Sequence, residues 1–236
     1  MNRFFMVLSL LPFFVHFKPG DPHQLAAIKE FEDSLPEELL REDAAWFEAW
    51  KASGIAQNTS VPYFHQLDNK SGQGYRECFS SSMAMIAAFY GKVKTDDEYN
   101  RIRERFGDTT SIEAQILALR SLGLHAEFRK DADGSLVEAE LAAGRPVALG
   151  FLHHGDMSRG EPPMCDSYNC GHWLVAVGFN RDDWTVNDPR GLIDIERGGF
   201  SGRYGGRNAK ISRQAFRMRW EVEGPGTGWV ILVDDE

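Results

Sequence analysis

A cysteine, a histidine and an aspartate stand in that order in three segments of the chain, and together they constrain its fold more than any other feature. Cys78 opens an apolar segment with helical spacing, His172 begins an apolar segment typical of a strand, and Asp188 follows the next such segment. A thiol, an imidazole and a carboxylate act as one chemical group only when they lie side by side. A chain that uses them together must bring one helix start and two strand ends to the same place.

The composition indicates one globular domain of ordinary size with a short extension. The chain has 236 residues, of which 42% are apolar, so it can bury a sizeable core. Its formal net charge of -9 argues against a general polyanion binder, and we expect no nucleic-acid partner. Three cysteines are too few for a disulfide scaffold in a chain of this length.

Residues 1–20 form an apolar N-terminal segment with two alternative interpretations. Arg3 precedes an apolar run over 4–17, which has the length and the positive flank of a signal-peptide core. The run lacks a small-residue cleavage site, and the alternative is a buried strand or hairpin at the domain edge. It is shorter than the about 20 residues of a membrane-spanning helix, so we expect no stable membrane span. The localisation stays open between cytoplasmic and exported.

Residues 21–60 are interpreted as an acidic helical extension and linker. The pattern predicts two short helices followed by a linker over 54–60. Trp46 and Trp50 lie at helical spacing on the second helix, where they either pack against the main domain or belong to a targeting module. The main domain is expected over 61–236.

The remainder of the chain has the pattern of an α+β fold, with helices first and an antiparallel sheet after them. Capping boxes at Thr95 and Thr110 mark two of the helix starts. The sequence predicts helices over 78–90, 95–107, 110–123, 135–144 and from 212, and strands over 124–128, 147–152, 172–179, 183–187 and 229–233.

His172 and Asp188 are expected to meet at one end of a β-hairpin. The strands 172–179 and 183–187 are joined by a short polar turn at 180–182. Antiparallel pairing places the start of one strand near the end of the other, which brings the carboxylate beside the ring. There it could fix the tautomer of the imidazole. A purely structural histidine is the alternative.

Cys78 is the candidate nucleophile and His172 is its candidate base. A helix N-terminus and a neighbouring imidazolium both favour the thiolate form of a cysteine. An inert buried cysteine is the alternative for Cys78. Gln66 is the candidate oxyanion donor, because its side-chain amide and the backbone N–H of Cys78 could bind a developing negative charge.

These segments resemble the papain-like C39 peptidase-like family over residues 61 to about 190. The resemblance rests on Val61-Pro62-Tyr63-Phe64-His65-Gln66, Cys78 with Met83 and Tyr90-Gly91, Gly144-Arg145-Pro146-Val147, Gly171-His172-Trp173 and Val186-Asn187-Asp188-Pro189. It implies a papain-like fold, with a nucleophile helix packed on an antiparallel sheet. It also implies that Cys78 is the nucleophile, His172 the base, Asp188 the orienting group and Gln66 the oxyanion donor. The chain contains no transporter segment, so the stand-alone members are the better comparison.

The first functional hypothesis is a thiol hydrolase that cleaves amide bonds, most simply a cysteine peptidase acting on a peptide or protein. Such chemistry needs no metal and no organic cofactor. A peptidoglycan stem peptide is the alternative substrate for the same chemistry. A catalytically silent binding or structural protein on this fold is the alternative from another class.

Two further features keep more than one interpretation. Cys165 and Cys170 close a small disulfide loop, contribute to a zinc site with His153, His154 or His172, or stay free thiols. The segment 153–170 around them is interpreted as a mobile loop that shapes substrate access.

The segment 197–219 holds seven basic residues and no acidic one. It is interpreted as a glycine-rich loop and a helix with solvated basic side chains, and the alternatives are nucleic acid or an anionic cell-wall polymer.

Overall fold

The computed structural model describes residues 56–57, 60–165, 170–200, 202 and 205–235. The expectations for residues 1–55, which include the apolar segment and the two acidic helices, lie outside this part. Within it, the helices are α4 (Cys78–Phe89), α5 (Asp96–Arg103), α6 (Ile112–Ser121), α7 (Gly134–Ala142) and α8 (Arg213–Trp220), with short 3-10 helices η2 (Gln66–Asp68), η3 (Gly74–Arg76) and η4 (Met157–Arg159). None of the helices in the described ranges is long and apolar enough to cross a membrane.

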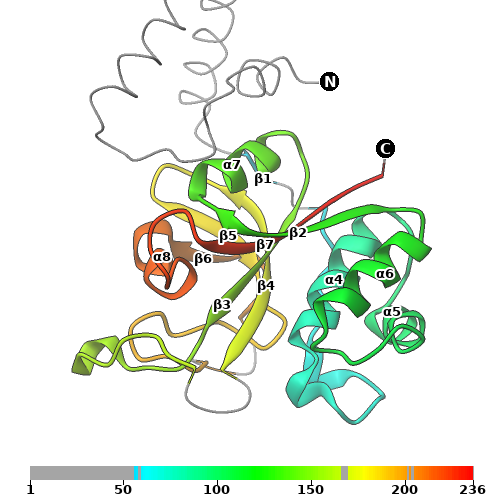
Figure 1. The fold of residues 1–236 in the computed structure, drawn as a ribbon, viewed down its shortest axis with the longest axis horizontal. Helices are drawn as coiled ribbons and strands as arrows, with labels where there is room; N and C mark the ends of the chain where they lie inside the picture. The colour runs from blue at the N-terminus through cyan, green and yellow to red at the C-terminus, as the bar shows by residue number, and fades with distance from the viewer. Residues whose placement is uncertain (1–55, 58–59, 166–169, 201, 203–204, 236) are drawn as a thin grey trace, which may run out of the picture. The chain divides into compact units, whose positions relative to one another are not determined.

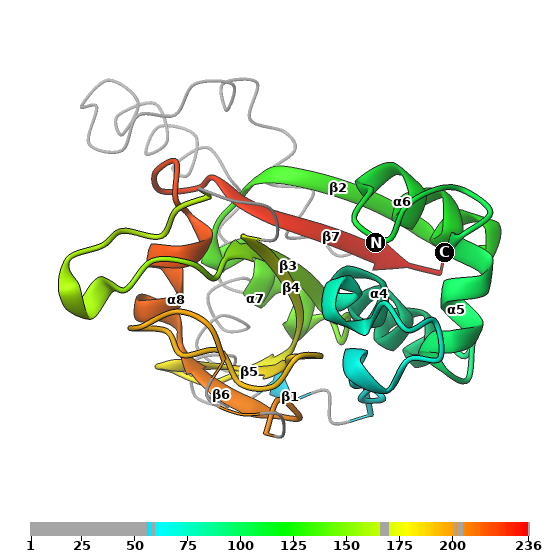
Figure 2. The same ribbon diagram turned by 90° about the horizontal axis from the view of Figure 1, so that it is seen from below.

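A single antiparallel sheet forms the centre of the described domain. Its strands are β1 (Ala56–Gln57), β2 (His125–Ala132), β3 (Val147–Leu152), β4 (Gly171–Phe179), β5 (Asp183–Asn187), β6 (Ala209–Ser212) and β7 (Gly228–Asp234). The order is β2-β7-β3-β4-β5-β6, and β1 also pairs with β4. Figure 2 shows β2 and β7 at one end of this order and β5 and β6 at the other. The predicted α+β class with an antiparallel sheet is confirmed.

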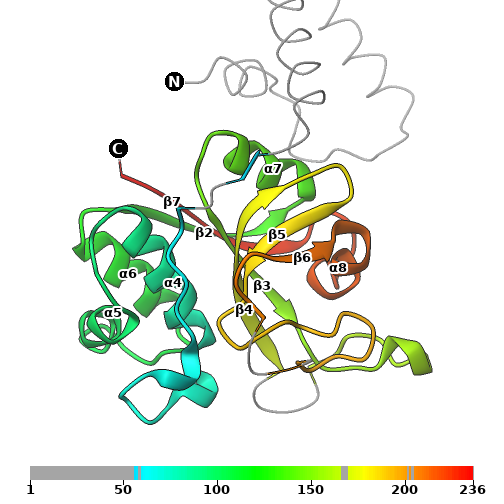
Figure 3. The same ribbon diagram turned by 180° about the vertical axis from the view of Figure 1, so that it is seen from behind.

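The helices are divided between the two sides of the sheet. Figure 1 shows α4, α5 and α6 together on one side and α8 on the other, and Figure 3 shows the same division from behind. The side chain of Thr95 caps α5 by accepting from the backbone N–H of Glu98 at 3.1 Å, as predicted. The cap of α6 is Ser111, one residue later than the predicted Thr110.

Helix α4 is buried more completely than its sequence pattern predicts. The helical spacing predicts a buried stripe of Phe79, Met83, Ile86, Ala87 and Tyr90. The first four belong to the core and Tyr90 is only partly buried, but every residue of 78–87 is buried. Its three consecutive serines fit this environment because each finds a hydrogen-bond partner; Ser82, for example, donates to the carbonyl of Trp173 at 3.1 Å. The helix is therefore an internal element that packs directly on β4.

Two parts of the sheet were not predicted. β1 lies within the segment 54–60, which was interpreted as a linker. β6 pairs with β5 along 183–186, although it lies in the basic segment that was interpreted as a loop. Both are short segments of two and four residues, too short for periodicity to give a clear signal.

Candidate active site

The β4–β5 hairpin brings His172 and Asp188 into direct contact. His172 is the second residue of β4, and Asp188 directly follows β5, which pairs antiparallel with β4. The ring Nε2 of His172 lies 2.8 Å from Oδ1 of Asp188, and both side chains are buried. The hydrogen bond leaves the other ring nitrogen, Nδ1, for a second partner.

The backbone and carboxylate of Asp188 are fixed by several further hydrogen bonds. The backbone N–H of Arg190 donates to Oδ1 at 3.0 Å, so this oxygen has two donors. The backbone N–H of Asp188 donates to the carbonyl of Gly206 at 2.8 Å, and the hydroxyl of Tyr63 donates to the carbonyl of Asp188 at 3.0 Å. A carboxylate held in this way can orient an imidazole without adjusting its own position.

Cys78 is the first residue of α4 and the second partner of His172. The two side chains interact, because both the charge and the hydrogen-bonding capacity of Cys78 act on the pKa of the ring. Burial by itself lowers the pKa of His172, but the negative charges of Asp188 and Cys78, with hydrogen bonds to both, raise this pKa to about 10. The helix adds its first-turn N–H groups, which have no partner within the helix, beside the sulfur. The imidazole thus interacts with the carboxylate on one side and with the sulfur on the other.

An aromatic stack fixes the distance between the helix start and the strand start. Phe79 follows Cys78, Trp173 follows His172, and their rings are parallel within 2° with centroids 4.0 Å apart. Gly150 on β3 makes room for this stack, because a Cβ there would lie 2.7 Å from the ring of Trp173. The sequence analysis did not identify this contact, although both aromatic residues directly follow candidate site residues.

Gln66 is buried in η2 and its backbone is joined to the segment of Asp188. Its backbone N–H donates to the carbonyl of Pro189 at 2.9 Å. Its side-chain Nε2 donates to the carbonyl of Gly74 at 2.6 Å. A side-chain amide carries two N–H donors, so one remains for another acceptor. Gly74 is required for this approach, because a Cβ there would lie 2.2 Å from the carbonyl oxygen of Gln66.

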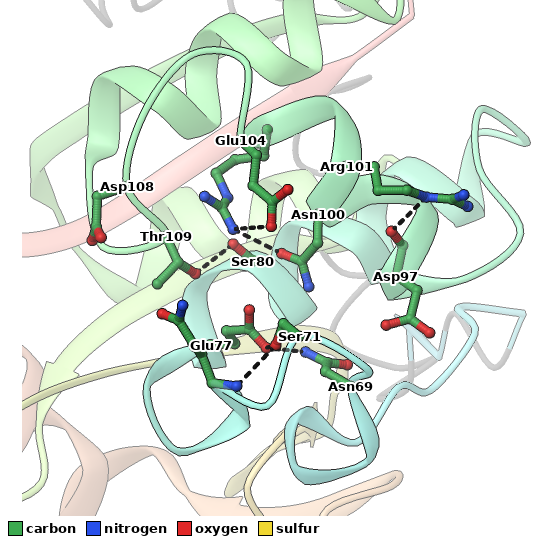
Figure 4. A network of polar contacts seen from close by, with 12 residues as sticks. Asn69, Ser71, Glu77, Ser80, Asp97, Asn100, Arg101, Glu104, Asp108 and Thr109 are labelled. Atoms are coloured by element: carbon green, nitrogen blue, oxygen red, sulfur yellow. Dashed lines mark hydrogen bonds and ion pairs between the residues drawn. The ribbon is translucent and has the colours of Figure 1, made fainter.

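A buried polar network supports the start of α4 from behind (Figure 4). The carboxylate of Glu77, the residue before Cys78, accepts from Asn69 Nδ2 and from the Ser71 hydroxyl, each at 2.8 Å. One turn further, Ser80 and Thr109 share a hydrogen bond of 2.7 Å. Sequence reasoning treated Glu77 only as a neighbour of the cysteine. A buried carboxylate needs such donors, so the network fixes the backbone that carries the sulfur.

Three rings surround the imidazole of His172 from the sheet side. The centroids of Phe200, Phe151 and His153 lie 4.8, 5.3 and 5.9 Å from the centroid of His172. His153 is itself buried, and burial together with the charge of His172 lowers its pKa to about 4. It therefore stays neutral beside an imidazolium. Sequence reasoning considered His153 only as a zinc ligand and did not single out Phe200.

Cys165 and Cys170 form a disulfide. Of the alternatives for this pair, the disulfide is confirmed, and neither sulfur is available as a zinc ligand. In the described ranges, no group of three or more His, Cys, Asp or Glu residues is arranged to hold a metal ion. Cys78 is the remaining cysteine of the chain, and its thiol is free.

Three arginines of the basic segment interact within the domain, whereas Arg197, Arg207 and Lys210 are exposed. Arg213 pairs with Glu138, and Arg217 pairs with Glu221 at 2.7 Å. Arg219 is completely buried. The interpretation of this segment as a loop and helix with solvated basic side chains is therefore wrong for Arg219, and it is incomplete for the other two.

The chain is similar to known proteins in sequence and in fold. The sequence model of the Peptidase_C39 like family matches residues 58–221, so the chain belongs to this family. The predicted resemblance is thereby confirmed, and the class of protein is a C39-like cysteine peptidase. No curated protein matches the chain significantly.

Several solved structures share the fold at low sequence identity. A protein from Bacillus anthracis described as a C39-like peptidase is 16% identical, with a TM-score of 0.51, covering 76% of this chain and 98% of that one. A double glycine motif protease from an AMS/PCAT transporter, solved with its leader peptide, is 19% identical, with a TM-score of 0.45 and coverages of 75% and 93%. The peptidase domain of Streptococcus ComA is 16% identical, with a TM-score of 0.47 and coverages of 75% and 99%.

Proposed function

We propose that this chain hydrolyses peptide bonds with Cys78 as nucleophile, His172 as acid and base, Asp188 as the orienting group and Gln66 as oxyanion donor. The observation that carries the proposal is the buried hydrogen bond between Asp188 and His172, whose ring also interacts with the free thiol of Cys78. Membership in a peptidase family supports the same chemistry and a peptide as the substrate.

In the acylation step, the sulfur of Cys78 attacks the carbonyl carbon of the scissile bond. Because the pKa of His172 is raised to about 10, the imidazole is protonated at neutral pH. In the proposed mechanism the sulfur attacks as a thiolate, which is the nucleophilic form of cysteine. A C–S bond forms and the C–N bond breaks, while the imidazolium transfers its proton to the leaving amine. The imidazole becomes neutral in this step, and Asp188 keeps its orientation.

In the deacylation step, neutral His172 accepts a proton from a water molecule that attacks the thioester. The C–S bond breaks, the carboxylic acid leaves, and the thiolate and imidazolium are restored. In both steps a negative charge develops on the carbonyl oxygen. The second N–H of Gln66 and a backbone N–H at the start of α4 would donate to it.

The test is a panel of peptide, isopeptide and cell-wall substrates with the wild type and Cys78→Ala. We expect peptide hydrolysis by the wild type and a loss of about 10,000-fold or more in Cys78→Ala, since the nucleophile is removed. The double variant Cys165→Ser/Cys170→Ser is the matched control and should stay active. Full activity in Cys78→Ala would overturn the proposal. Release of stem peptides alone would identify a cell-wall substrate.

The reactivity of Cys78 distinguishes an enzyme from a catalytically silent binding protein. Iodoacetamide labels an activated thiolate at neutral pH much faster than an ordinary thiol. If Cys78 reacts no faster than free cysteine, and the panel shows no turnover, the binding interpretation replaces the enzymatic one.

A further inference from the structure

Arg219 on α8 is a fully buried cation whose partners are main-chain carbonyl groups. Burial lowers its pKa from the ordinary arginine value, but a guanidinium stays protonated in proteins. In the described ranges it forms no ion pair with a carboxylate. Its donors reach the carbonyl oxygens of Ile195 (2.7 Å), Gly155 (2.8 Å), His154 (2.9 Å), Leu152 (3.3 Å) and Glu196 (3.4 Å).

The five carbonyl groups belong to two segments that are distant in the sequence. One segment, 152–155, begins at the last residue of β3, and the other, 195–196, precedes the turn at Gly198. Since all five donors of a guanidinium lie in one rigid plane, a single side chain fixes both segments relative to each other. The two backbones are also in close contact, because a Cβ at Gly198 would lie 2.6 Å from the carbonyl oxygen of His153.

One ring that covers His172 belongs to the first segment, and another lies shortly after the second. His153 belongs to the first segment, and Phe200 follows the second. The two rings contact each other at 5.4 Å, and the backbone N–H of Gly199 donates to the carbonyl of His153 at 2.9 Å. Only 3% of the surface of His172 remains exposed. The cover over the imidazole therefore depends on how the two segments are joined.

We propose that Arg219 is a positioning residue for the peptidase site, which holds His153 and Phe200 against His172 and keeps water from its hydrogen bond to Asp188. The proposal rests on the proposed function for its catalytic meaning. The structural claim, that Arg219 holds the cover over the imidazole of His172, does not depend on the proposed function.

The consequence is a predicted change in the titration of His172. The charged or titratable groups that face this ring are Asp188 after β5, Cys78 on α4 and His153 after β3, with Arg190 beyond the ring of Phe200. The attraction of Asp188 for the imidazolium is strong because the buried pair is excluded from water. If the cover opens, water relieves the burial that lowers the pKa of His172, and it also screens the Asp188 and Cys78 interactions that raise this pKa. Because the raising contributions together outweigh burial in the covered site, the pKa returns toward its ordinary value and the ring loses its proton at lower pH.

The experiment measures the titration of His172 by NMR in Arg219→Met, with assignment by His172→Gln. We expect its midpoint to fall by one pH unit or more in Arg219→Met, and by less in Arg219→Lys, which retains a charge and three donors. Arg217→Met is the matched control from the same helix, and its midpoint should be that of the wild type. An unchanged midpoint in folded Arg219→Met, or an equal shift in Arg217→Met, would overturn the proposal.

A second variant keeps the test decisive if Arg219→Met does not fold. Phe200→Leu removes the covering ring and leaves the contacts of Arg219 in place. We expect the same fall in the His172 midpoint, and an unchanged midpoint contradicts the proposal. Because NMR reports the ring directly, this result is independent of whether the chain hydrolyses peptides. If it does, the alkaline limb of the kcat/KM profile of Arg219→Met should move to lower pH in parallel.

Discussion

The two halves of the candidate site are assembled by different means. On the sheet side, His172 and Asp188 are 16 residues apart and meet within one hairpin. On the helix side, Cys78 and Gln66 come from the start of the domain and reach the hairpin through tertiary contacts, the Phe79–Trp173 stack and the bond from Gln66 to Pro189. The proposed base is thus placed by local structure, whereas the proposed nucleophile and oxyanion donor are placed by packing.

The difference separates two kinds of substitution. A change at the hairpin should alter the chemistry of the imidazole and leave the fold intact. A change at the stack should alter stability and activity together, because the same contacts hold the helix on the sheet and the sulfur at the ring. Substitutions on each side therefore test the comparison.

Asp188→Asn is expected to have the largest effect among the substitutions on the base side. Without the carboxylate charge, the pKa of His172 falls toward its ordinary value and the imidazolium is no longer favoured. We expect kcat/KM to fall by about 100- to 10,000-fold, in the range known for the orienting carboxylate of a triad. Peptide hydrolysis measures kcat/KM, and circular dichroism measures whether the fold is retained. A rate equal to the wild type would remove Asp188 from the site.

Gln66→Ala tests the helix side without disturbing the stack. Loss of one oxyanion donor typically costs about 100- to 1000-fold in kcat. We expect such a loss with little change in KM, measured by steady-state kinetics. Gln73→Ala is the matched control, because Gln73 is exposed and makes no side-chain capping bond. Equal activities of the two variants would contradict the role of Gln66.

Gly150→Ala tests the stack itself. The new Cβ would lie 2.7 Å from the ring of Trp173, so the ring must move away from its present position over Phe79. We expect a loss of about 1–3 kcal/mol in the free energy of unfolding, as for other overpacked cores, and a lower kcat. Urea unfolding measures the first and peptide hydrolysis the second.

The control for this substitution is Gly171→Ala. A Cβ at Gly171 meets no heavy atom within 4 Å, although the residue directly precedes His172. Both quantities should stay at the wild-type level. If Gly150→Ala behaves in the same way, the stack does not position the sulfur.

The disulfide should have the smallest effect on the reaction. Its two cysteines are only 5 residues apart, and chain entropy for so short a loop gives a stabilisation of about 2 kcal/mol at most. Cys165→Ser/Cys170→Ser should therefore lower the melting temperature slightly and leave kcat/KM unchanged. A large loss of activity would show that the loop before β4 helps to place His172.

The same contrast explains what the sequence could predict. The strands of the hairpin have clear apolar runs and a polar turn, so the contact between ring and carboxylate follows from their spacing. The helix start at Cys78 was also predictable, from its apolar run and the glycine that ends it. The approach of the sulfur to the ring follows only from the family resemblance and not from local patterns, because the stack depends on an interaction between residues 94 positions apart.

The sequence did not predict several other features, because their signals lie in the residue composition of a segment and not in its hydrophobic periodicity. Arg219 was counted among solvated basic residues, since the sequence shows a run of charge and not the carbonyl groups that compensate it. Phe200 stands between glycines in a segment without apolar spacing. The disulfide stayed one of three alternatives, because two cysteines near histidines fit more than one chemistry.

The most direct test of the central claim is the rate of Cys78 alkylation by iodoacetamide at pH 6, in the wild type and in His172→Gln. Cys78 is the single free thiol, so the reaction reports one sulfur. An ordinary cysteine, with a pKa of about 8.5, is less than about 1% ionised at this pH and reacts slowly. We predict that the wild type reacts at least about tenfold faster than free cysteine and that His172→Gln loses this advantage. Equal rates for the wild type and His172→Gln would contradict an ion pair between sulfur and ring.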